Sequence, residues 1–477
     1  MTPAPAPGSP APVTATPPNP RLREGLSRAI LAIALPSMMT NVATALFGLA
    51  DLWVIGRLGV ASAQGAVEIG AKLLMTVLVV FNFLRSGTVA LTAQAAGRDD
   101  QAAQAATLVR GLAAALAIGV ALLLARPLVM DLGLQMLGAS GPVTGLARTY
   151  VDIRYWGSVP WLLNAVLVGW LIGRRRMRTV LAVEVGANLV HVALDLTLVL
   201  GLGLGVAGVA VATLSSETLK LLALAAMVAR EGPARGALRI IRERMTWRTG
   251  ELLALFRLNR DLLARTALLM TATVLLTRAG ARQGPTVLAA NAILYQLFML
   301  SALLIDGFES ASQVLCGEAL GGRDRQRFQA VVRVTLAWAV GGAVVVTLAY
   351  AVAGARFAAA FSTNAAVIAT TRAYVGWAVA MPLAGVASFV FDGVFIGSSW
   401  TRAMLISMGA ALAVFVAGLF AFQPLGNHGL WLAFTLFFIA RAAGQAWLLP
   451  GLTARAFAER VPAVLDAPDL DSPEAGR

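Results

Sequence analysis

The sequence predicts an all-α integral membrane protein with twelve transmembrane helices. Hydrophobic residues make up 58% of the chain and charged residues only 13%, whereas soluble domains carry roughly 25% charged residues. A membrane-spanning helix needs about 20 mostly apolar residues. Twelve such segments and their connections account for nearly all 477 residues, so no large soluble domain fits in the remainder.

The predicted spans follow one another as long apolar windows separated by short polar segments. Within lipid such a window must be a helix, because its backbone polar groups find no water to bond. Pro36 in the first window removes one backbone hydrogen bond and permits a helix kink. Gly201, Gly203 and Gly205 join the fifth and sixth windows and predict a tight hairpin. The windows cover residues 28–55, 65–92, 108–130, 148–173, 180–200, 205–229, 262–283, 288–313, 328–352, 372–398, 404–422 and 428–450.

Composition divides the chain into five segments. The first twenty residues are rich in Pro, Ala, Thr and Ser and carry no charged side chain before Arg21, which indicates a disordered tail rather than a signal peptide. The longest loop between spans is strongly basic and separates two groups of six spans. The expected segments are an N-terminal tail (1–27), an N-terminal six-helix lobe (28–229), a basic linker (230–261), a C-terminal six-helix lobe (262–450) and a C-terminal tail (451–477).

The net charge of +14 suggests nucleic acid as a partner, but its distribution argues against one. The basic residues are mostly arginines in short runs between apolar windows, without interleaved aromatic residues. Most flank the ends of spans on the side that holds both termini, which the positive-inside rule assigns to the cytoplasm. We therefore expect a multi-pass protein of the plasma membrane (in a bacterium, the inner membrane) with cytoplasmic termini and the basic loop against anionic lipids. The single cysteine, Cys316, excludes an intramolecular disulfide and a multi-cysteine metal site.

A short repeat relates the two groups of spans. Gly97-Arg98-Asp99 follows the second span, and Gly322-Arg323-Asp324 follows the eighth. An even number of spans separates the two copies, so the halves are parallel repeats related by an axis along the membrane normal. This arrangement predicts two helix bundles that face a central cavity.

A series of short segments runs in a characteristic order over residues 28–450: Ala34-Leu35-Pro36, Gly48-Leu49-Ala50-Asp51, Gly56-Arg57-Leu58-Gly59, Phe83-Leu84-Arg85-Ser86-Gly87-Thr88, Leu91-Thr92-Ala93-Gln94-Ala95, Asn259-Arg260-Asp261, Leu288-Ala289-Ala290-Asn291-Ala292, Asp306-Gly307-Phe308, Asp392-Gly393-Val394-Phe395-Ile396-Gly397 and Gly426-Asn427-His428-Gly429-Leu430-Trp431. In these segments the chain resembles the multidrug and toxic compound extrusion (MATE) family, in its DinF-like branch. The resemblance implies two pseudo-symmetric six-helix lobes, a working monomer, alternating access, and export of hydrophobic or cationic small molecules driven by an inward proton or sodium gradient. We expect no cofactor.

A charge within lipid costs about 3 kcal/mol on insertion scales, so an ionisable side chain inside a span must pair with a partner, face a cavity or take up a proton. Ionisable side chains inside the first six spans are therefore candidates for ion coupling. Asp195 lies in an apolar run without a basic residue within a helical turn, and His191 shares its helix face. Histidine titrates near neutral pH, so the two can form a proton relay, or a structural hydrogen bond that fixes the fifth helix. Asp51 lies late in the first span, where a pair with Arg57 at the membrane interface is the alternative.

The family resemblance places a cation site at Asp51, His191, Asp195 and Thr213. The family has an asparagine where this chain has His191, and Asn188 stands at the first asparagine of the same pattern. Sodium prefers oxygen ligands, which an imidazole nitrogen replaces poorly, so we predict proton coupling. If sodium binds instead, water or Asn188 must supply the missing ligand.

Two aspartates in the second half also have counterparts in the family. Asp306 and Asp392 lie in the eighth and tenth spans and could bind a cationic substrate or a second proton. Structural neutralisation, for example by Arg278 in the seventh span, is an equal alternative.

Two other functions are alternatives to antiport. A lipid or lipid-linked saccharide flippase shares the two-lobe plan, but for anionic lipid carriers it would line its cavity with basic residues, and the in-span residues recognised here are mainly acidic. An intramembrane enzyme would need a motif such as His-Glu-x-x-His or closely spaced magnesium-binding aspartates, and neither pattern occurs. Phosphate-binding loops are also absent from the sequence, so we expect no enzymatic activity and no direct use of ATP.

Overall fold

The computed structural model describes residues 20–136, 141–242 and 249–458, and every regular element in these ranges is a helix. Within them, twelve helical segments are long and apolar enough to cross a membrane. Each overlaps one of the predicted windows, so the predicted all-α membrane fold is confirmed.

The first half of the chain supplies six of these spans. The second span is divided by a single 3₁₀ turn, and so is the fourth. The fifth ends in a π-helical turn, η3, directly after Asp195. Gly203 and Gly205 have φ angles of +66° and +54°, which glycine adopts without strain, and form the predicted tight hairpin. The elements are α1 (Pro20–Gly56), α2 (Ala61–Val79), η1 (Val80–Asn82), α3 (Phe83–Gly97), α4 (Gln101–Met136), α5 (Pro142–Arg154), η2 (Tyr155–Gly157), α6 (Ser158–Gly173), α7 (Met177–Asp195), η3 (Leu196–Gly201) and α8 (Gly205–Ala229).

The second half supplies the other six spans. Each is a single helix, and the last two are joined by a short 3₁₀ turn. The elements are α11 (Thr249–Ala281), α12 (Pro285–Gly321), α13 (Arg325–Ala360), α14 (Ala365–Gly397), α15 (Thr401–Ala421), η5 (Gln423–Leu425) and α16 (Asn427–Ala458).

The helices extend into segments that composition assigns to tails and linker. Helix α1 begins at Pro20, inside the predicted N-terminal tail, and α16 runs to Ala458, inside the predicted C-terminal one. The linker holds α9 (Gly232–Arg235), α10 (Ala237–Arg242) and the first turns of α11, and Ile240 of α10 packs against α4. Residues 1–19 and 459–477 of the predicted tails lie outside the described residues.

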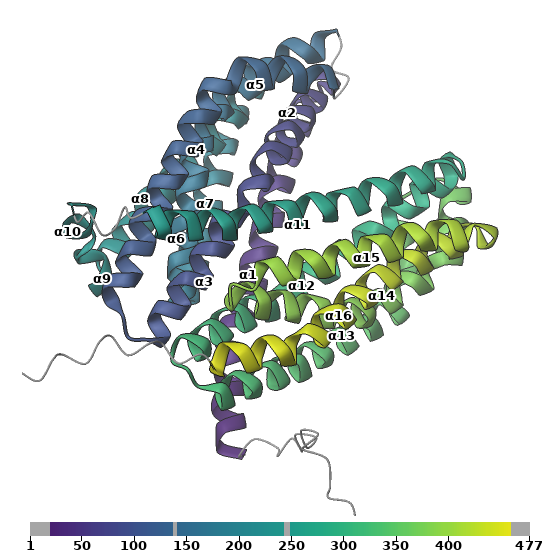
Figure 1. The fold of residues 1–477 in the computed structure, drawn as a ribbon. Coiled ribbons are helices and arrows are strands. Elements are labelled where there is room, and N and C mark those ends of the chain that lie inside the picture. Colours follow the sequence, from purple (N-terminus) through teal and green to yellow (C-terminus); the bar gives the residue numbers. More distant parts are fainter. Residues whose placement is uncertain (1–19, 137–140, 243–248, 459–477) are drawn as a thin grey trace, which may run out of the picture.

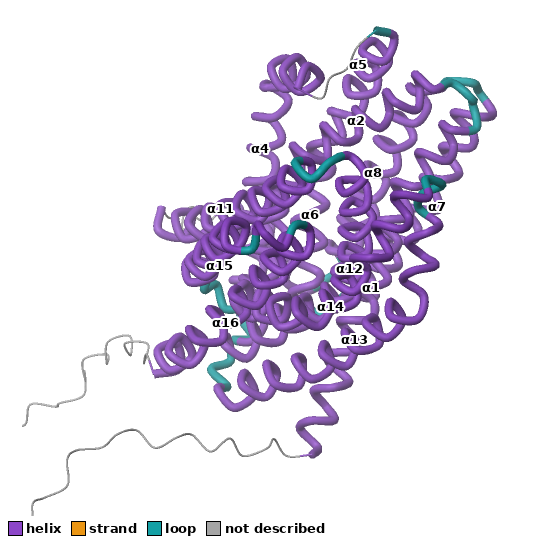
Figure 2. Tube along the Cα trace, turned by 90° about the vertical axis from the view of Figure 1, so that its right-hand side faces the viewer, coloured by secondary structure: helices purple, strands orange, loops and turns teal. Residues whose placement is uncertain are grey.

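The two halves form two helix groups that diverge from one joined end. In Figure 1, α2 and α4–α8 form one arm and α12–α16 the other, and α11 runs from the first towards the second. The described ends of α1 and α16 both lie at the joined end (Figures 1 and 2). The molecule is therefore closed on the side of the termini and splayed on the opposite side.

Close backbone packing of α3 against α12 holds the joined end together. A Cβ atom on Gly97 would lie 2.1 Å from the carbonyl oxygen of Glu318, and one on Gly321 would lie 2.0 Å from that of Gln94. Both glycines lie in or beside the two copies of the short repeat. The repeat therefore marks the place where the two halves meet.

The turns at this end repeat as well. The second and eighth spans are followed by Asp99 and Arg323, with φ angles of +53° and +55°, and the fourth and tenth by Arg175 and Ser399, both at +58°. Left-handed non-glycine residues are uncommon. Their recurrence at matching places supports two halves built on one plan.

Candidate functional site

A buried cluster in the first half joins two aspartates through one imidazole. Nε2 of His191 lies 2.6 Å from Oδ1 of Asp51 and 3.0 Å from Oδ2 of Asp195. His191 and Asp195 have no exposed surface, and Asp51 keeps 7% of its own. The geometry follows from local structure, since the four-residue spacing places His191 and Asp195 on one face of α7 while Asp51 comes from the neighbouring α1.

The second imidazole nitrogen faces Ser216 of α8. Nδ1 of His191 lies 3.3 Å from the hydroxyl oxygen of Ser216, and that hydroxyl also lies 3.0 Å from the carbonyl oxygen of Thr213. A serine has one hydroxyl proton. When it donates to the Thr213 carbonyl, Nδ1 must be the donor to Ser216, and with Nε2 donating to an ionised aspartate the imidazole is doubly protonated. When it turns to Nδ1, the imidazole is neutral, so the contact accommodates both charge states.

The structure brings together three of the five predicted coupling residues. The side-chain amide of Asn188 donates to the backbone carbonyl of Ala43 at 3.0 Å and thereby links α7 to α1. The hydroxyl of Thr213 donates to the carbonyl of Val209 within its own helix at 2.8 Å. Ser216, one helical turn further along α8, occupies the place beside the imidazole that the resemblance gives to Thr213. Pro36 lies inside an uninterrupted α1, where its carbonyl accepts from the Thr40 hydroxyl.

A second polar layer lies along α7 and α8 towards the termini. Nζ of Lys220 pairs with Glu184 at 2.7 Å, and Glu184 also accepts from the hydroxyl of Thr44 on α1 at 3.2 Å. Glu217 accepts from the amide of Asn164 at 2.9 Å. Together with the Asn188 contact, this layer joins the middle of α1 to α7.

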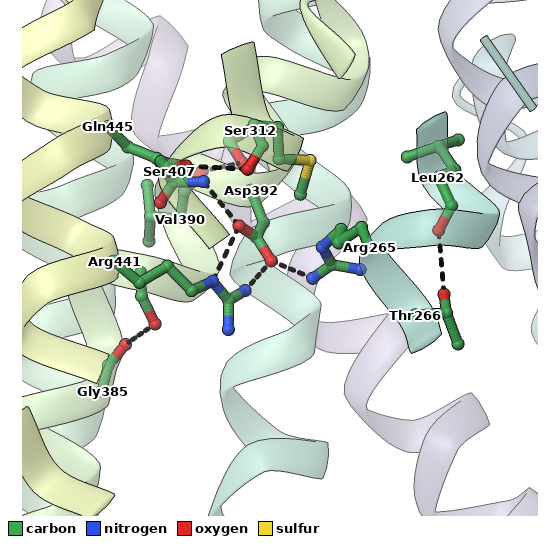
Figure 3. Close-up of polar contacts among 12 residues, drawn as sticks. Leu262, Arg265, Thr266, Ser312, Gly385, Val390, Asp392, Ser407, Arg441 and Gln445 are labelled. Carbon is green, nitrogen blue, oxygen red and sulfur yellow. Dashed lines mark hydrogen bonds and ion pairs between the residues drawn. The ribbon is translucent and has the colours of Figure 1, made fainter. Parts of the chain in front are cut away.

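In the second half, Asp392 is neutralised by two arginines. Figure 3 shows its carboxylate between Arg265 of α11 and Arg441 of α16, with Gln445 donating to it at 2.7 Å. Asp392 is fully buried. The contacts of Asp392 therefore agree with the alternative that an arginine neutralises it structurally. The partners are Arg265 and Arg441 and not Arg278, which is exposed. Their distance along the chain from Asp392 hides them from sequence reasoning.

Asp306 keeps partial exposure and interacts with an acidic residue that sequence reasoning missed. Glu309 lies three residues later on α12, so the two carboxyl groups share one helix face. Arg265, Arg441 and Arg85 of α3 all act on Asp306 electrostatically. The three-residue spacing of Asp306 and Glu309 on one helix was the available signal.

The N-terminal cluster resembles a small cation site but has the spacing of a hydrogen-bonded relay. Ligand atoms of Asp51, His191 and Asp195 lie within 4.8 Å of one another. The 2.6 Å between Nε2 of His191 and Oδ1 of Asp51 is the distance of a direct hydrogen bond.

Comparison with known proteins identifies the family. The MatE family model matches residues 36–197 and 262–421, one segment in each half of the chain. The chain belongs to the MatE family. It is 35% identical to DNA damage-inducible protein F of Escherichia coli, over 88% of this chain and 91% of that protein. This is a family of membrane transporters, and the DinF-like resemblance seen in the sequence is confirmed.

More distant relatives and solved structures agree. The chain is 25% identical to the Arabidopsis thaliana chloroplastic Protein DETOXIFICATION 44, over 88% of this chain and 81% of that protein. A crystal structure of a MATE protein in the bent conformation superposes with a TM-score of 0.81 at 20% identity, covering 92% of this chain and 98% of the other. The outward-facing structure of a multidrug resistance MATE transporter gives 0.79 at 21% identity, covering the same shares. These structures support the two-lobe MATE fold.

Proposed function

We propose that this MatE-family transporter is a proton-coupled antiporter that exports hydrophobic or cationic small molecules and works as a monomer in the plasma membrane with cytoplasmic termini. The observation that carries the proposal is the contact of one imidazole with two aspartates, Asp51 and Asp195, in a buried site. The names of relatives, which include detoxification and multidrug resistance proteins, are consistent with export of toxic compounds.

Charge balance explains why such a cluster would take up protons. Two ionised aspartates and one imidazolium carry a net charge of −1, and one further proton on a carboxyl group makes the cluster neutral. Burial disfavours net charge. The closed, dry form of the site therefore favours the added proton, and a form in contact with water releases it. Asp51, which alone keeps some exposed surface, is the group through which we expect protons to pass.

Helix α1 provides a physical link between proton uptake and the two lobes. Asp51 lies near its end, while its middle packs on the opposite lobe, where Ser37 contacts Ser310 at 3.0 Å and Asn41 donates to the Leu303 carbonyl at 3.1 Å. A shift of α1 that follows a change of charge at Asp51 alters these contacts. Protonation can thereby favour one lobe arrangement over the other.

The carboxyl pair of Asp306 and Glu309 is the best-placed group for a cationic substrate. Both side chains are partly exposed on α12, and α12 also carries the inter-lobe contacts to α1. Asp392 is less suited, because Arg265 and Arg441 already neutralise it. We therefore assign the binding of a second proton or of the substrate to Asp306 and Glu309, and not to Asp392.

Transport in proteoliposomes under separate proton and sodium gradients tests the proposal. Efflux of a fluorescent organic cation is followed for the wild type, Asp195→Asn and His191→Asn. We expect proton-driven transport in the wild type and its loss in Asp195→Asn. Because His191→Asn restores the amide oxygen found in the family pattern, we expect that variant to gain sodium dependence.

The outcomes separate the parts of the proposal. Sodium-driven transport by the wild type contradicts proton coupling but leaves antiport intact. Asp131→Asn serves as the control for removing one carboxylate, because Asp131 is exposed on α4 and pairs with Arg148 at 2.6 Å. If no tested cation moves under either gradient, the flippase alternative gains support.

A further inference from the structure

A cavity of about 1010 Å³ lies between the two lobes at the joined end. Its walls come from the ends of α3 and α4 in the first lobe and from α11, α15 and α16 in the second. This volume matches the upper range of small-molecule sites. The cavity lies far along the helices from Asp51, so it is separate from the proposed proton site. Its charged lining residues are Arg98, Arg110, Arg260, Asp261 and Arg402.

The charged residues of the cavity wall are strongly biased towards arginine. Four arginines and one aspartate line it, which gives a net formal charge of +3 (4 − 1). Arg260 pairs with that aspartate, Asp261, at 2.9 Å. The side chains of Arg98 and Arg402 make no hydrogen bond or ion pair within the described part of the chain, so both remain available to an anion. Arginine's planar fork suits phosphate oxygens.

The two available arginines belong to different lobes. Arg98 follows α3 in the first lobe, and Arg402 lies in the first turn of α15 in the second. An anion held by both would bridge the lobes at their joined end. The apolar part of the wall includes Leu91, Leu452 and Ile406, and the last of these is largely exposed.

We propose that this cavity binds a phosphate-bearing amphiphile, with its phosphate between Arg98 and Arg402 and its apolar part against Leu91, Ile406 and Leu452. The arginines lie at the ends of spans, the depth at which lipid headgroups meet the protein, and basic pockets between transmembrane helices bind such headgroups. An anionic membrane lipid is the source that this placement favours. Because the ligand bridges both lobes, its binding stabilises the arrangement that is closed at the termini side.

Lipid binding to the purified full-length protein tests the proposal. Native mass spectrometry compares dioleoyl phosphatidylglycerol with dioleoyl phosphatidylcholine for the wild type and for the double variant Arg98→Gln/Arg402→Gln. Arg325→Gln/Arg333→Gln is the matched control, because both residues are exposed on α13 and neither lines the cavity. We expect the wild type and the control to bind phosphatidylglycerol more tightly than phosphatidylcholine, and the cavity variant to bind it about tenfold or more weakly.

Competition experiments identify the source of the phosphate. If inorganic phosphate or a short-chain alkyl phosphate displaces phosphatidylglycerol from the wild type but not from the cavity variant, the site reads the phosphate group and also admits soluble compounds. Equal binding of both lipids, or equal loss in the cavity variant and the control, overturns the proposal.

A conformational measurement tests the bridging role separately. Spin labels at Gln64→Cys and Gln283→Cys, both exposed on the splayed side, report the separation of the lobes there in a Cys316→Ala background. Phosphatidylglycerol should increase the long-distance population in the wild type and leave the cavity variant unchanged. A shift of the same size in both proteins contradicts the bridging role.

Discussion

Replacing Glu318 by glutamine should loosen the joined end of the two lobes. Glu318 of α12 accepts from Nε of Arg175 at 2.5 Å and from a second nitrogen of the same guanidinium, so a two-point ion pair joins the lobes. It also pairs with Arg327 at 3.1 Å, but Arg327 belongs to its own lobe. Only the Arg175 contact must break when the lobes part.

The size of the effect follows from partial exposure. The side chain of Glu318 is 11% exposed and that of Arg175 is 37% exposed. An exposed ion pair contributes about 0.2–1 kcal/mol, and a hydrogen bond to a charged group about 1.5–3 kcal/mol. Because solvent reaches Arg175, we expect this ion pair to contribute about 1.5 kcal/mol, at the low end of the second range. Glu318→Gln should therefore move the ratio of closed to open molecules at the termini side about tenfold towards open.

Distances between spin labels can measure this shift. Gln101→Cys and Gln326→Cys place labels on exposed residues of opposite lobes at the termini side, with Cys316→Ala removing the native thiol. Arg327→Gln is the matched control, because it removes a partner of Glu318 within one lobe. Unchanged distances in Glu318→Gln, or an equal shift in Arg327→Gln, would refute this prediction.

Three further predictions follow from single contacts. Gly321→Ala should also favour opening at the termini side, because its Cβ would lie 2.0 Å from the Gln94 carbonyl, whereas Gly341→Ala, with nothing within 4 Å, should not; equal spin-label distances in the two variants would refute this. Asp392→Asn should lower the melting temperature, because an unpaired buried charge costs about 3–5 kcal/mol; an unchanged melting temperature in detergent would argue against the ion-pair cluster. Ser216→Ala should reduce proton-driven transport, because it removes the side-chain contact to Nδ1 of His191 in both charge states of the imidazole. Thr213→Val is its control, and an equal loss of transport in both variants would contradict the assignment.

Local periodicity was enough to predict the spans and one face of the candidate site. Apolar windows identified twelve helices because lipid leaves the backbone no other regular structure of this length. The contact between His191 and Asp195 was predictable because both residues lie on one helix. The glycines of the short repeat, Gly97 and Gly322, predicted two related halves.

Contacts between distant helices were not predictable from local pattern. Arg265 and Arg441 reach Asp392 from helices far away in the sequence, so nothing near Asp392 indicated its neutralisation. The sequence pattern could not decide whether Ser216 or Thr213 lies beside His191. Both residues lie within one helical turn of α8, so the choice depends on the rotation of that helix. The helical starts at Pro20 and Thr249 were missed because polar and proline-rich composition hides helices that extend beyond the membrane.

Proton release on substrate binding tests the central claim most directly. The purified protein in weakly buffered solution is mixed with a transported organic cation, and the change in pH is recorded for the wild type, Asp195→Asn and Asp131→Asn. We predict that the wild type and Asp131→Asn release protons in proportion to the substrate bound, and that Asp195→Asn binds substrate with little or no release. Equal proton release by Asp195→Asn and the wild type would contradict a coupling site at Asp51, His191 and Asp195.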